Sequence, residues 1–381
     1  MARPLTLDDL RRHAIARSLF NPLTLPAAVR RLGFVQADPM RAPARAQDLI
    51  LFQRVQGYRA GDLERRYERL GLEEDAFVNY GFVPRDMLAL LHPRTPRQAW
   101  DEDTMQRARA VLDFVRERGL AHPREVGEAF AHHGRVAGYW GGDLNASTRL
   151  LDHMHYHGWL RVRRREGGTR VYEAMVHDEQ DDSPAARLAR AQALVDTIVA
   201  LYAPLPSASL GYLVTLLRYG APHLAVETRA VVQAARTRYG HAVVDGTTWF
   251  WPADENPASR RHKPHEGLRL LAPFDPVAWD RRRFEMLWGW AYRFEAYVPA
   301  ARRTMGHYAL PLLWGEQMLG WANLRWERAQ LRHELGFIAG RAPREPAFRR
   351  ALDEELARFE VFLSGYVQAG ARAAGPDATC D

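Results

Sequence analysis

The chain has 381 residues, 47% of them hydrophobic and 26% charged, and this composition is typical of a soluble globular protein with two or three domains. Basic side chains outnumber acidic ones by 53 to 46, and the net charge of +7 suits a polyanionic partner such as nucleic acid. The one cysteine, Cys380, excludes an intramolecular disulfide and a thiolate-bound zinc or iron–sulfur site. Because no apolar run has the length of a membrane span and the first residues lack the apolar core of a signal peptide, we expect a cytoplasmic protein.

The first part of the chain predicts short helices and one strand. Thr6 is a candidate N-cap for a helix that ends before Pro22, and a second helix is expected from about Pro26 to Leu32 with Gly33 as its C-cap. Two more short helices are expected after residue 48. The apolar and aromatic stretch 77–83, closed by a proline, predicts a strand.

The segment Phe34–Arg45 places an amide and a carboxylate two residues apart. In an extended backbone the side chains of Gln36 and Asp38 point the same way, and Pro39 biases Asp38 away from the helical region. A polar pair of this kind beside arginines can hold a water molecule next to a phosphate backbone. On the local residues alone, an ordinary Asp-Pro turn is the simpler interpretation.

Residues 101–180 predict a winged helix-turn-helix: three helices followed by a hairpin whose turn is Gly167-Gly168. This fold favours duplex DNA, although winged helices also serve as structural and protein-interaction modules. The wing arginines alternate at strand spacing and are expected to share one face. The predicted phosphate contacts are Arg149 on the recognition helix and Arg161, Arg163 and Arg165 at the wing.

A related pattern of helices and an Asp245-Gly246 hairpin follows, and the first segment fits the same plan less cleanly. From Leu268 onward, buried strands, a second hairpin and a helix from about Pro346 to Tyr366 are expected. We therefore predict an α+β fold with tandem winged helices, three in number, and a β-rich C-terminal domain with a closing helix. The predicted domains are 1–100, 101–180, 181–255 and 267–370.

Candidate metal ligands are few. The histidines at 153, 155 and 157 fall at spacings that do not converge on one ion from a helix, and no nucleotide-binding or nucleophile-elbow motif is present. We therefore expect neither a metal nor a cofactor.

Several segments, spread over nearly the whole chain, form a recognisable set. They are Val35–Asp38 (VQAD), Ala44-Arg45, Leu51-Phe52, Gly57-Tyr58, Leu270–Trp279 (LLAPFDPVAW), Tyr292–Ala300 (YRFEAYVPA) and the hairpin ending near Gly320. Together they resemble the bacterial winged-helix DNA glycosylases that unhook interstrand crosslinks (the AlkZ/YcaQ, or AlkX, family), and the C-terminal strings are the most specific part of the resemblance.

The resemblance implies a catalytic signature Gln-Φ-Asp, in which Φ is apolar, at Gln36 and Asp38. Asp38 would position or deprotonate the water that attacks C1′ and stabilise oxocarbenium charge, Gln36 would help to hold that water, and Arg41 and Arg45 would contact DNA. The chain departs from the family pattern at three places, and Met40, Asn79 and Tyr80 at these departures become candidate lesion contacts. Pro39-Met40-Arg41 replaces a Thr-Φ-Asn stretch, Asn79-Tyr80 replaces a His-Glu pair, and Ala296 replaces a cysteine.

These observations lead to three hypotheses about function. The first is a monofunctional, metal-free DNA glycosylase that hydrolyses the N-glycosidic bond of N7- or N3-alkylated purines, including crosslinks, in base excision repair. The second is a non-catalytic winged-helix DNA-binding protein such as a regulator, and the third is a resistance protein for one natural-product adduct. In each case the expected partner is double-stranded DNA and the expected state is a monomer without membrane contact.

Overall fold

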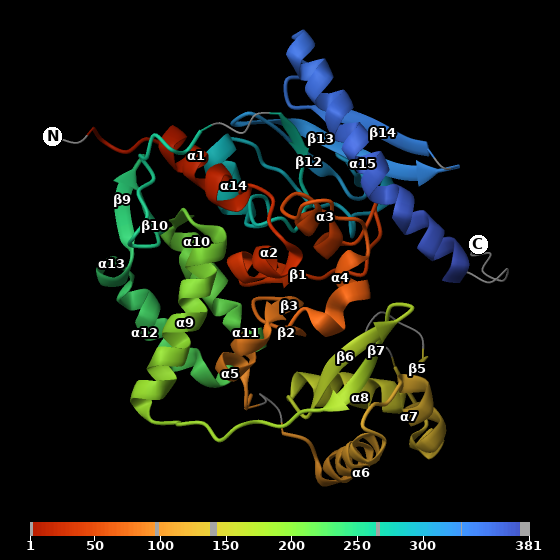
Figure 1. Ribbon diagram of the computed structural model, residues 1–381. Helices are drawn as coiled ribbons and strands as arrows, with labels where there is room; N and C mark the ends of the chain where they lie inside the picture. Colours follow the sequence, from red (N-terminus) through yellow and green to blue (C-terminus); the bar gives the residue numbers. More distant parts are fainter. Residues whose placement is uncertain (1–2, 96–98, 138–142, 264–266, 329, 374–381) are drawn as a thin grey trace. The chain divides into compact units, whose positions relative to one another are not determined.

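The computed structural model describes residues 3–95, 99–137, 143–263, 267–328 and 330–373 (Figure 1). The chain divides into two compact units, each built from segments that are distant in sequence. Unit 1 comprises Met1–Leu63, Val195–Val214 and Val232–Asp381, and unit 2 comprises Glu64–Leu194 and Thr215–Val231. The division into four consecutive domains stays a prediction. The mixture of helices and small antiparallel sheets in both units confirms a mixed α and β fold.

The N-terminal elements of unit 1 follow the local signals in the sequence. Helix α1 (Leu7–Ser18) begins at a capping box, in which the Thr6 hydroxyl accepts from the Asp9 amide and the Asp9 carboxylate accepts from the Thr6 amide. Helix α2 (Leu25–Leu32) ends at Gly33, whose φ of 72° lies in the left-handed region that favours glycine. The predicted caps are confirmed at both positions. Strand β1 (Val35–Gln36), helix α3 (Ala46–Phe52) and helix α4 (Asp62–Arg66) follow.

The C-terminal part of unit 1 is an antiparallel sheet with strand order β11-β12-β13-β14. Helix α15 packs against strands β11 and β14 of this sheet, and Figure 1 shows the helix beside β14. A core of buried apolar side chains joins helices α1 and α14 to the sheet. The bounds are β11 (Leu268–Leu270), α14 (Arg281–Trp288), β12 (Leu310–Trp314), β13 (Gln317–Glu327), β14 (Gln330–Phe337) and α15 (Pro346–Ala373).

Unit 1 also contains a small sheet with strand order β8-β10-β9. The hairpin between β9 and β10 turns at Asp245 and Gly246, which have φ angles of 48° and 73°, so the predicted Asp-Gly turn is confirmed. The elements of this region are α9 (Pro184–Tyr202), which crosses the boundary between the units, β8 (Leu205–Pro206), α10 (Ser207–Thr215), α13 (Ala235–Arg238), β9 (Gly240–Val244) and β10 (Thr247–Trp251).

Unit 2 contains the predicted sequence of three helices and a hairpin. Asp101 caps the first helix and Asn145 the third, and each side chain accepts a hydrogen bond from a backbone amide of the first turn. A short β4–β5 pair precedes the third helix, and the wing is the antiparallel pair β6–β7. The bounds are α6 (Glu102–Arg118), α7 (Pro123–Ala129), β4 (Arg135–Ala137), β5 (Asp143–Asn145), α8 (Ala146–Tyr156), β6 (Leu160–Glu166), β7 (Thr169–Ala174), α11 (Leu217–Gly220) and α12 (Ala225–Gln233).

One predicted element is wrong in its position. The strand expected over residues 77–83 is a hairpin, with β2 (Leu72–Ala76) and β3 (Tyr80–Pro84) paired antiparallel and residues 77–79 in the turn; helix α5 (Leu88–Leu91) follows. The Phe77 amide donates to the Asn79 carbonyl, and the Asn79 side chain accepts from the Tyr80 amide, so this asparagine closes the turn. None of the helices in the described part of the chain is long and apolar enough to cross a membrane.

Candidate functional site

Gln36 and Asp38 lie where strand β1 leaves the core of unit 1. Gln36 belongs to the strand and is 4% exposed, whereas Asp38 follows it and is partly exposed. The Asp38 Oδ1 atom accepts a hydrogen bond of 2.9 Å from the Met40 amide, which is the geometry of an Asx turn. Both interpretations of the segment therefore hold. Gln36 lies in the extended strand β1, and the turn that follows the strand fixes the Asp38 carboxylate.

The environment of Asp38 favours its protonated form. Burial raises the pKa of the carboxyl group, and the hydrogen bond from the Met40 amide opposes this shift only in part. A carboxylate with a raised pKa binds a proton more strongly than a fully hydrated one and is therefore a stronger base. General-base catalysis is most effective when the pKa of the base lies near the working pH. Asp38 is therefore suited to accept a proton from water.

Two glutamines accompany Asp38. The Oε1 atom of Gln36 is buried and has no hydrogen-bond partner within the described part of the chain, so it is an acceptor without a donor. Gln47, in the first turn of α3 and 3% exposed, accepts a hydrogen bond of 3.3 Å from the Asp38 amide. Sequence reasoning missed Gln47, although a glutamine nine residues after Asp38, just before an expected helix, was the available signal.

An aromatic wall formed by Phe274, Phe294 and Tyr308 belongs to the same unit. The Phe294 and Tyr308 rings meet edge to face with centroids 5.4 Å apart, and the Phe274 and Phe294 rings lie 5.1 Å apart. Asp38 is the first of the charged or ionisable neighbours that raise the pKa of Tyr308, after burial itself. Tyr308 is 3% exposed and lies two residues before β12.

A buried ion pair holds the scaffold under this site. Arg54, just after α3, donates two hydrogen bonds of 2.7 and 2.8 Å to Asp275, and both side chains are completely buried. Arg54 also donates to the carbonyls of Ser18 and Ile50 at 2.8 Å. One guanidinium thus ties the helix that carries Gln47 to the chain segment next to Phe274.

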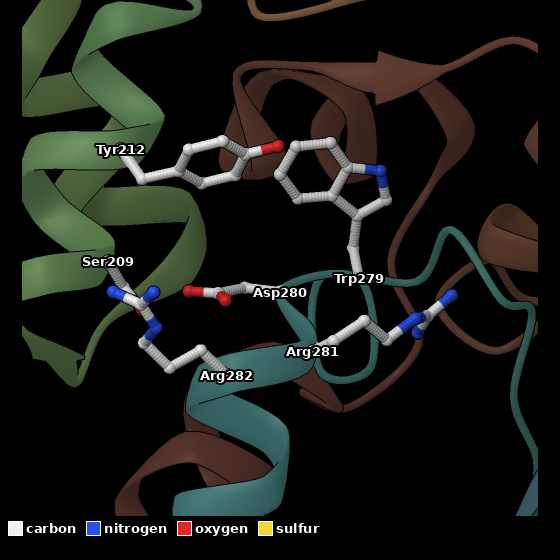
Figure 2. Close-up of a pocket in the computed structure, with 6 residues that line it drawn as sticks. All are labelled: Ser209, Tyr212, Trp279, Asp280, Arg281 and Arg282. Atoms are coloured by element: carbon white, nitrogen blue, oxygen red, sulfur yellow. The ribbon is translucent and has the colours of Figure 1, made fainter. Parts of the chain in front are cut away.

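A hollow of about 290 Å³ lies between α10 and the start of α14 (Figure 2). Arg281 is one of the residues that border the hollow, but in Figure 2 its side chain extends away from Tyr212. The Arg281 guanidinium lies 4.3 Å from the centroid of the Tyr292 ring. Neither Gln36 nor Asp38 lines this hollow, so it is separate from the candidate site. The lining residues are Ser209, Tyr212, Trp279, Asp280, Arg281 and Arg282.

The wing arginines have partners inside unit 2. Arg161 and Arg165 form ion pairs with Glu73 and Glu74 of β2, two acids that are almost completely buried, and Arg163 lies 3.2 Å from the more exposed Glu68. Phosphate contact by these arginines stays a prediction, and among the three Arg163 has the greatest side-chain exposure.

The remaining predicted contacts are divided between the units. Arg41 and Arg45 follow Asp38 in unit 1, and Arg41 is exposed whereas Arg45 is half-buried. Unit 2 holds the half-buried Arg149 on α8 and the two predicted lesion contacts in the β2–β3 hairpin. Asn79 is exposed in the turn, whereas the Tyr80 hydroxyl donates to Glu74 and the Arg170 guanidinium covers the Tyr80 ring.

The more exposed wing arginine, Arg163, is expected to affect DNA binding. Arg163→Gln should lower the slope of log Kd for duplex DNA against log salt concentration by about 1, since it removes one phosphate contact. Fluorescence anisotropy at several salt concentrations measures this slope. An unchanged slope would remove Arg163 from the interface.

The more buried wing arginine, Arg165, is expected to affect stability instead. Arg165→Gln should cost ~3 kcal/mol of stability, because it leaves the buried Glu74 without its bidentate partner. Urea unfolding of this variant, with Arg163→Gln for comparison, measures the loss.

No group of three or more His, Cys, Asp or Glu side chains that could hold a metal ion is present within the described ranges. The site consists of a partly desolvated carboxylate and two buried amides. Water activation by a carboxylate is the chemistry of a hydrolase.

The family model for the DNA glycosylase AlkZ-like family matches residues 29–362, which include this whole site, and the chain therefore belongs to that family. Among solved structures, the Streptomyces sahachiroi DNA glycosylase AlkZ is similar in fold, with a TM-score of 0.57 and 14% identity. The alignment covers 95% of this chain and 98% of that one.

Proposed function

We propose that the protein is a monofunctional DNA glycosylase that hydrolyses the N-glycosidic bond of N7- or N3-alkylated purines, including those in interstrand crosslinks. The observation that carries the proposal is the partly buried Asp38, two residues after the buried Gln36, within a chain of the AlkZ-like DNA glycosylase family. The sequence Gln36-Ala37-Asp38 corresponds to the Gln-Φ-Asp form of the family signature.

The proposed reaction needs little from the protein. Alkylation makes the purine cationic, so the C1′–N9 bond breaks with its electron pair moving into the base and no general acid is required. Asp38 stabilises the positive charge that develops on the sugar and accepts the proton of the water whose oxygen bonds to C1′. Gln36 orients that water through its Oε1 atom, which has no hydrogen-bond partner among the residues that the structure describes. The products are the free base and an abasic site.

Hydrolysis is favoured over lyase chemistry. A lyase reaction through a Schiff base needs an amine, and the protein's one lysine, Lys263, belongs to the segment between β10 and β11 rather than to the candidate site. The abasic product is therefore expected to stay uncleaved until alkali is added.

The direct test uses two oligonucleotide duplexes, one with a single N7-methylguanine and one with a nitrogen-mustard crosslink. Mass spectrometry measures free base, and a denaturing gel measures separation of the crosslinked strands, with undamaged duplex as the control. Release of base without strand scission is the expected result. Tight, salt-dependent binding of both duplexes without any release would instead favour the non-catalytic DNA-binding protein.

The rate of base release is expected to rise with pH. The water-activating form of Asp38 is the carboxylate, and burial raises the pKa of this group, so activity should be lost as pH falls through that raised value. Single-turnover rates from pH 4 to 9 should follow the titration of one group with a midpoint above that of a hydrated aspartate. A rate that increases towards low pH would contradict Asp38 as the base.

A further inference from the structure

The hollow between α10 and the start of α14 contains two buried polar atoms without partners. Asp280 is 4% exposed and Ser209 is 1% exposed, and both residues line the hollow. The Asp280 Oδ2 atom and the Ser209 hydroxyl have no hydrogen-bond partner among the residues that the structure describes. Buried polar groups of this kind cost free energy, so each of them calls for a reason. A ligand that fills the hollow and bonds to both atoms would supply that reason.

The structural role of Asp280 accounts for only one of its two carboxylate oxygens. Oδ1 accepts a 3.3 Å hydrogen bond from the Arg283 amide and so caps helix α14. A serine would cap the helix about equally well without a second oxygen. In Figure 2 the carboxylate points towards α10, below the Tyr212 ring. Its second oxygen is therefore a pure acceptor at the hollow.

The frame of the hollow is fixed by Arg283, whose side chain is completely buried. Its guanidinium donates to the Pro204 carbonyl, shortly before α10, at 2.9 Å and to the Val277 carbonyl, shortly before α14, at 3.1 Å. One side chain thus ties together the two segments that form the hollow. A preorganised frame of this kind lowers the free-energy cost of binding.

Two aromatic side chains, Tyr212 and Trp279, provide a stacking surface at the same hollow. In Figure 2 they extend towards one another, Tyr212 from α10 and Trp279 from the segment before α14. Tyr212 is 54% exposed, and the Trp279 ring packs against the buried Tyr202 with centroids 5.6 Å apart. Aromatic side chains at a concave site are the surfaces on which planar nucleobases stack.

The charges at the hollow select among planar ligands. Arg282 is exposed, whereas Asp280 is buried. A phosphate is attracted by the arginine and repelled by the carboxylate, so the part of a nucleic acid that reaches Asp280 must be a base edge with an N–H donor. The two unpartnered atoms are almost closed off from solvent. The exposed side chains of Tyr212 and Arg282 must therefore turn aside to admit a base, and exposed side chains change rotamer within nanoseconds.

We propose that the hollow binds one unpaired nucleobase, which stacks on Tyr212 and Trp279 and donates an N–H hydrogen bond to the Asp280 Oδ2 atom. The Ser209 hydroxyl bonds to a neighbouring ring nitrogen or carbonyl of the base. Where the base belongs to a DNA strand, Arg282 contacts the adjoining phosphate. A free base and an unpaired base in a strand share this chemistry, and the test below separates them.

The nucleobase in this hollow is not the one that reacts at Asp38, because neither Gln36 nor Asp38 lines the hollow. The inference concerns binding in a chain of a DNA glycosylase family and does not depend on the proposed hydrolysis.

The probe is 2-aminopurine, a fluorescent base that carries an amino donor and loses emission when it stacks on an aromatic ring. Three samples are compared: a duplex with one unpaired 2-aminopurine, the fully paired duplex, and the free base. We expect wild type to bind the first duplex about tenfold more tightly than the second and to quench its emission, since stacking of one base contributes about 1–3 kcal/mol. Quenching of the free base as well would show that the base alone is sufficient. Quenching in the strand alone, lost in Arg282→Gln, would show that the phosphate is required.

Two variants test the contacts separately. Tyr212→Ala should lower affinity for the unpaired base about tenfold and leave the Kd for paired duplex unchanged. Asp280→Asn should cause a similar loss, because asparagine still caps α14 but presents a donor where the base needs an acceptor. Tyr219→Ala is the matched control, since Tyr219 is an exposed tyrosine of unit 2 outside the hollow, and it should behave as wild type. Circular dichroism verifies that each variant is folded.

Three results would overturn the proposal, whether or not the protein releases alkylated bases. The first is equal affinity for both duplexes without quenching in any sample. The second is an equal loss of affinity for paired and unpaired DNA in Tyr212→Ala, which would make the tyrosine a general DNA contact. The third is release of the probe by tetramethylammonium chloride but not by the same concentration of sodium chloride, which would identify a cation site instead.

Discussion

Asp38→Asn is expected to lower the single-turnover rate of base release by at least ~100-fold, since general-base assistance contributes about 10²–10⁴-fold. The asparagine has nearly the same shape, and its carbonyl oxygen can still accept from the Met40 amide, so the local turn should persist. What disappears is the negative charge and the ability to take a proton. Mass spectrometry of the released base, with enzyme in excess over N7-methylguanine duplex, measures the effect.

Stability provides the control for this variant. Folding raises the pKa of Asp38, so the folded state favours the protonated acid, and ionisation of Asp38 at neutral pH opposes folding. Asp38→Asn should therefore leave thermal stability unchanged or slightly higher while activity is lost. Asp8→Asn removes the same charge from an exposed position in the first turn of α1 and should retain activity. Wild-type rates in Asp38→Asn would exclude the carboxylate from the chemistry.

Asp275→Asn is expected to have the largest effect on stability, about 3–5 kcal/mol. The variant leaves the Arg54 guanidinium, which is completely buried, without a counter-charge. Arg54 would keep its bonds to the carbonyls of Ser18 and Ile50, but these do not neutralise its charge. Urea unfolding followed by circular dichroism gives the difference directly.

Two comparisons separate the cost of a buried charge from the loss of a contact. Asp103→Asn breaks an ion pair to Arg107 on the surface of α6 and should change stability by less than ~0.5 kcal/mol. The double variant Arg54→Met with Asp275→Leu removes both charges and should recover most of the loss. If Asp275→Asn were as mild as Asp103→Asn, the buried pair would not be what holds α3 to the aromatic wall.

The sequence predicted those elements whose ends are marked by local chemistry. The Thr6 capping box, the left-handed Gly33 and the Asp245-Gly246 turn each depend on a few neighbouring residues, and all three are present in the structure. Gln36 and Asp38 could be selected because their spacing is local and matches a family signature.

Strand β2 could not be predicted, because three of its five residues are acidic, whereas buried strands are usually rich in apolar residues. Glu73, Glu74 and Asp75 are almost completely buried, and their charges are balanced by arginines from distant segments, such as Arg161 and Arg165 of the wing. Nothing in the local pattern reveals these partners. The sequence alone therefore predicts a strand over the apolar residues 77–83, which follow β2. The same pairs explain why the alternating wing arginines cannot be assigned to DNA from spacing alone.

The site residue that the sequence did not reveal, Gln47, is only nine residues from Asp38. Its burial and its hydrogen bond from the Asp38 amide depend on how α3 packs against β1, and the local sequence pattern shows neither.

The separation of Arg54 from Asp275 also matters for a chain that emerges from the ribosome in order. The two residues are 221 positions apart, so the N-terminal segment with Gln36 and Asp38 is made long before the carboxylate that neutralises Arg54. Until then, burial of the arginine is unfavourable and the segment with the candidate site has no stable support. We expect the newly synthesised protein to complete its candidate site only near the end of translation, when the C-terminal sheet that completes unit 1 has been made.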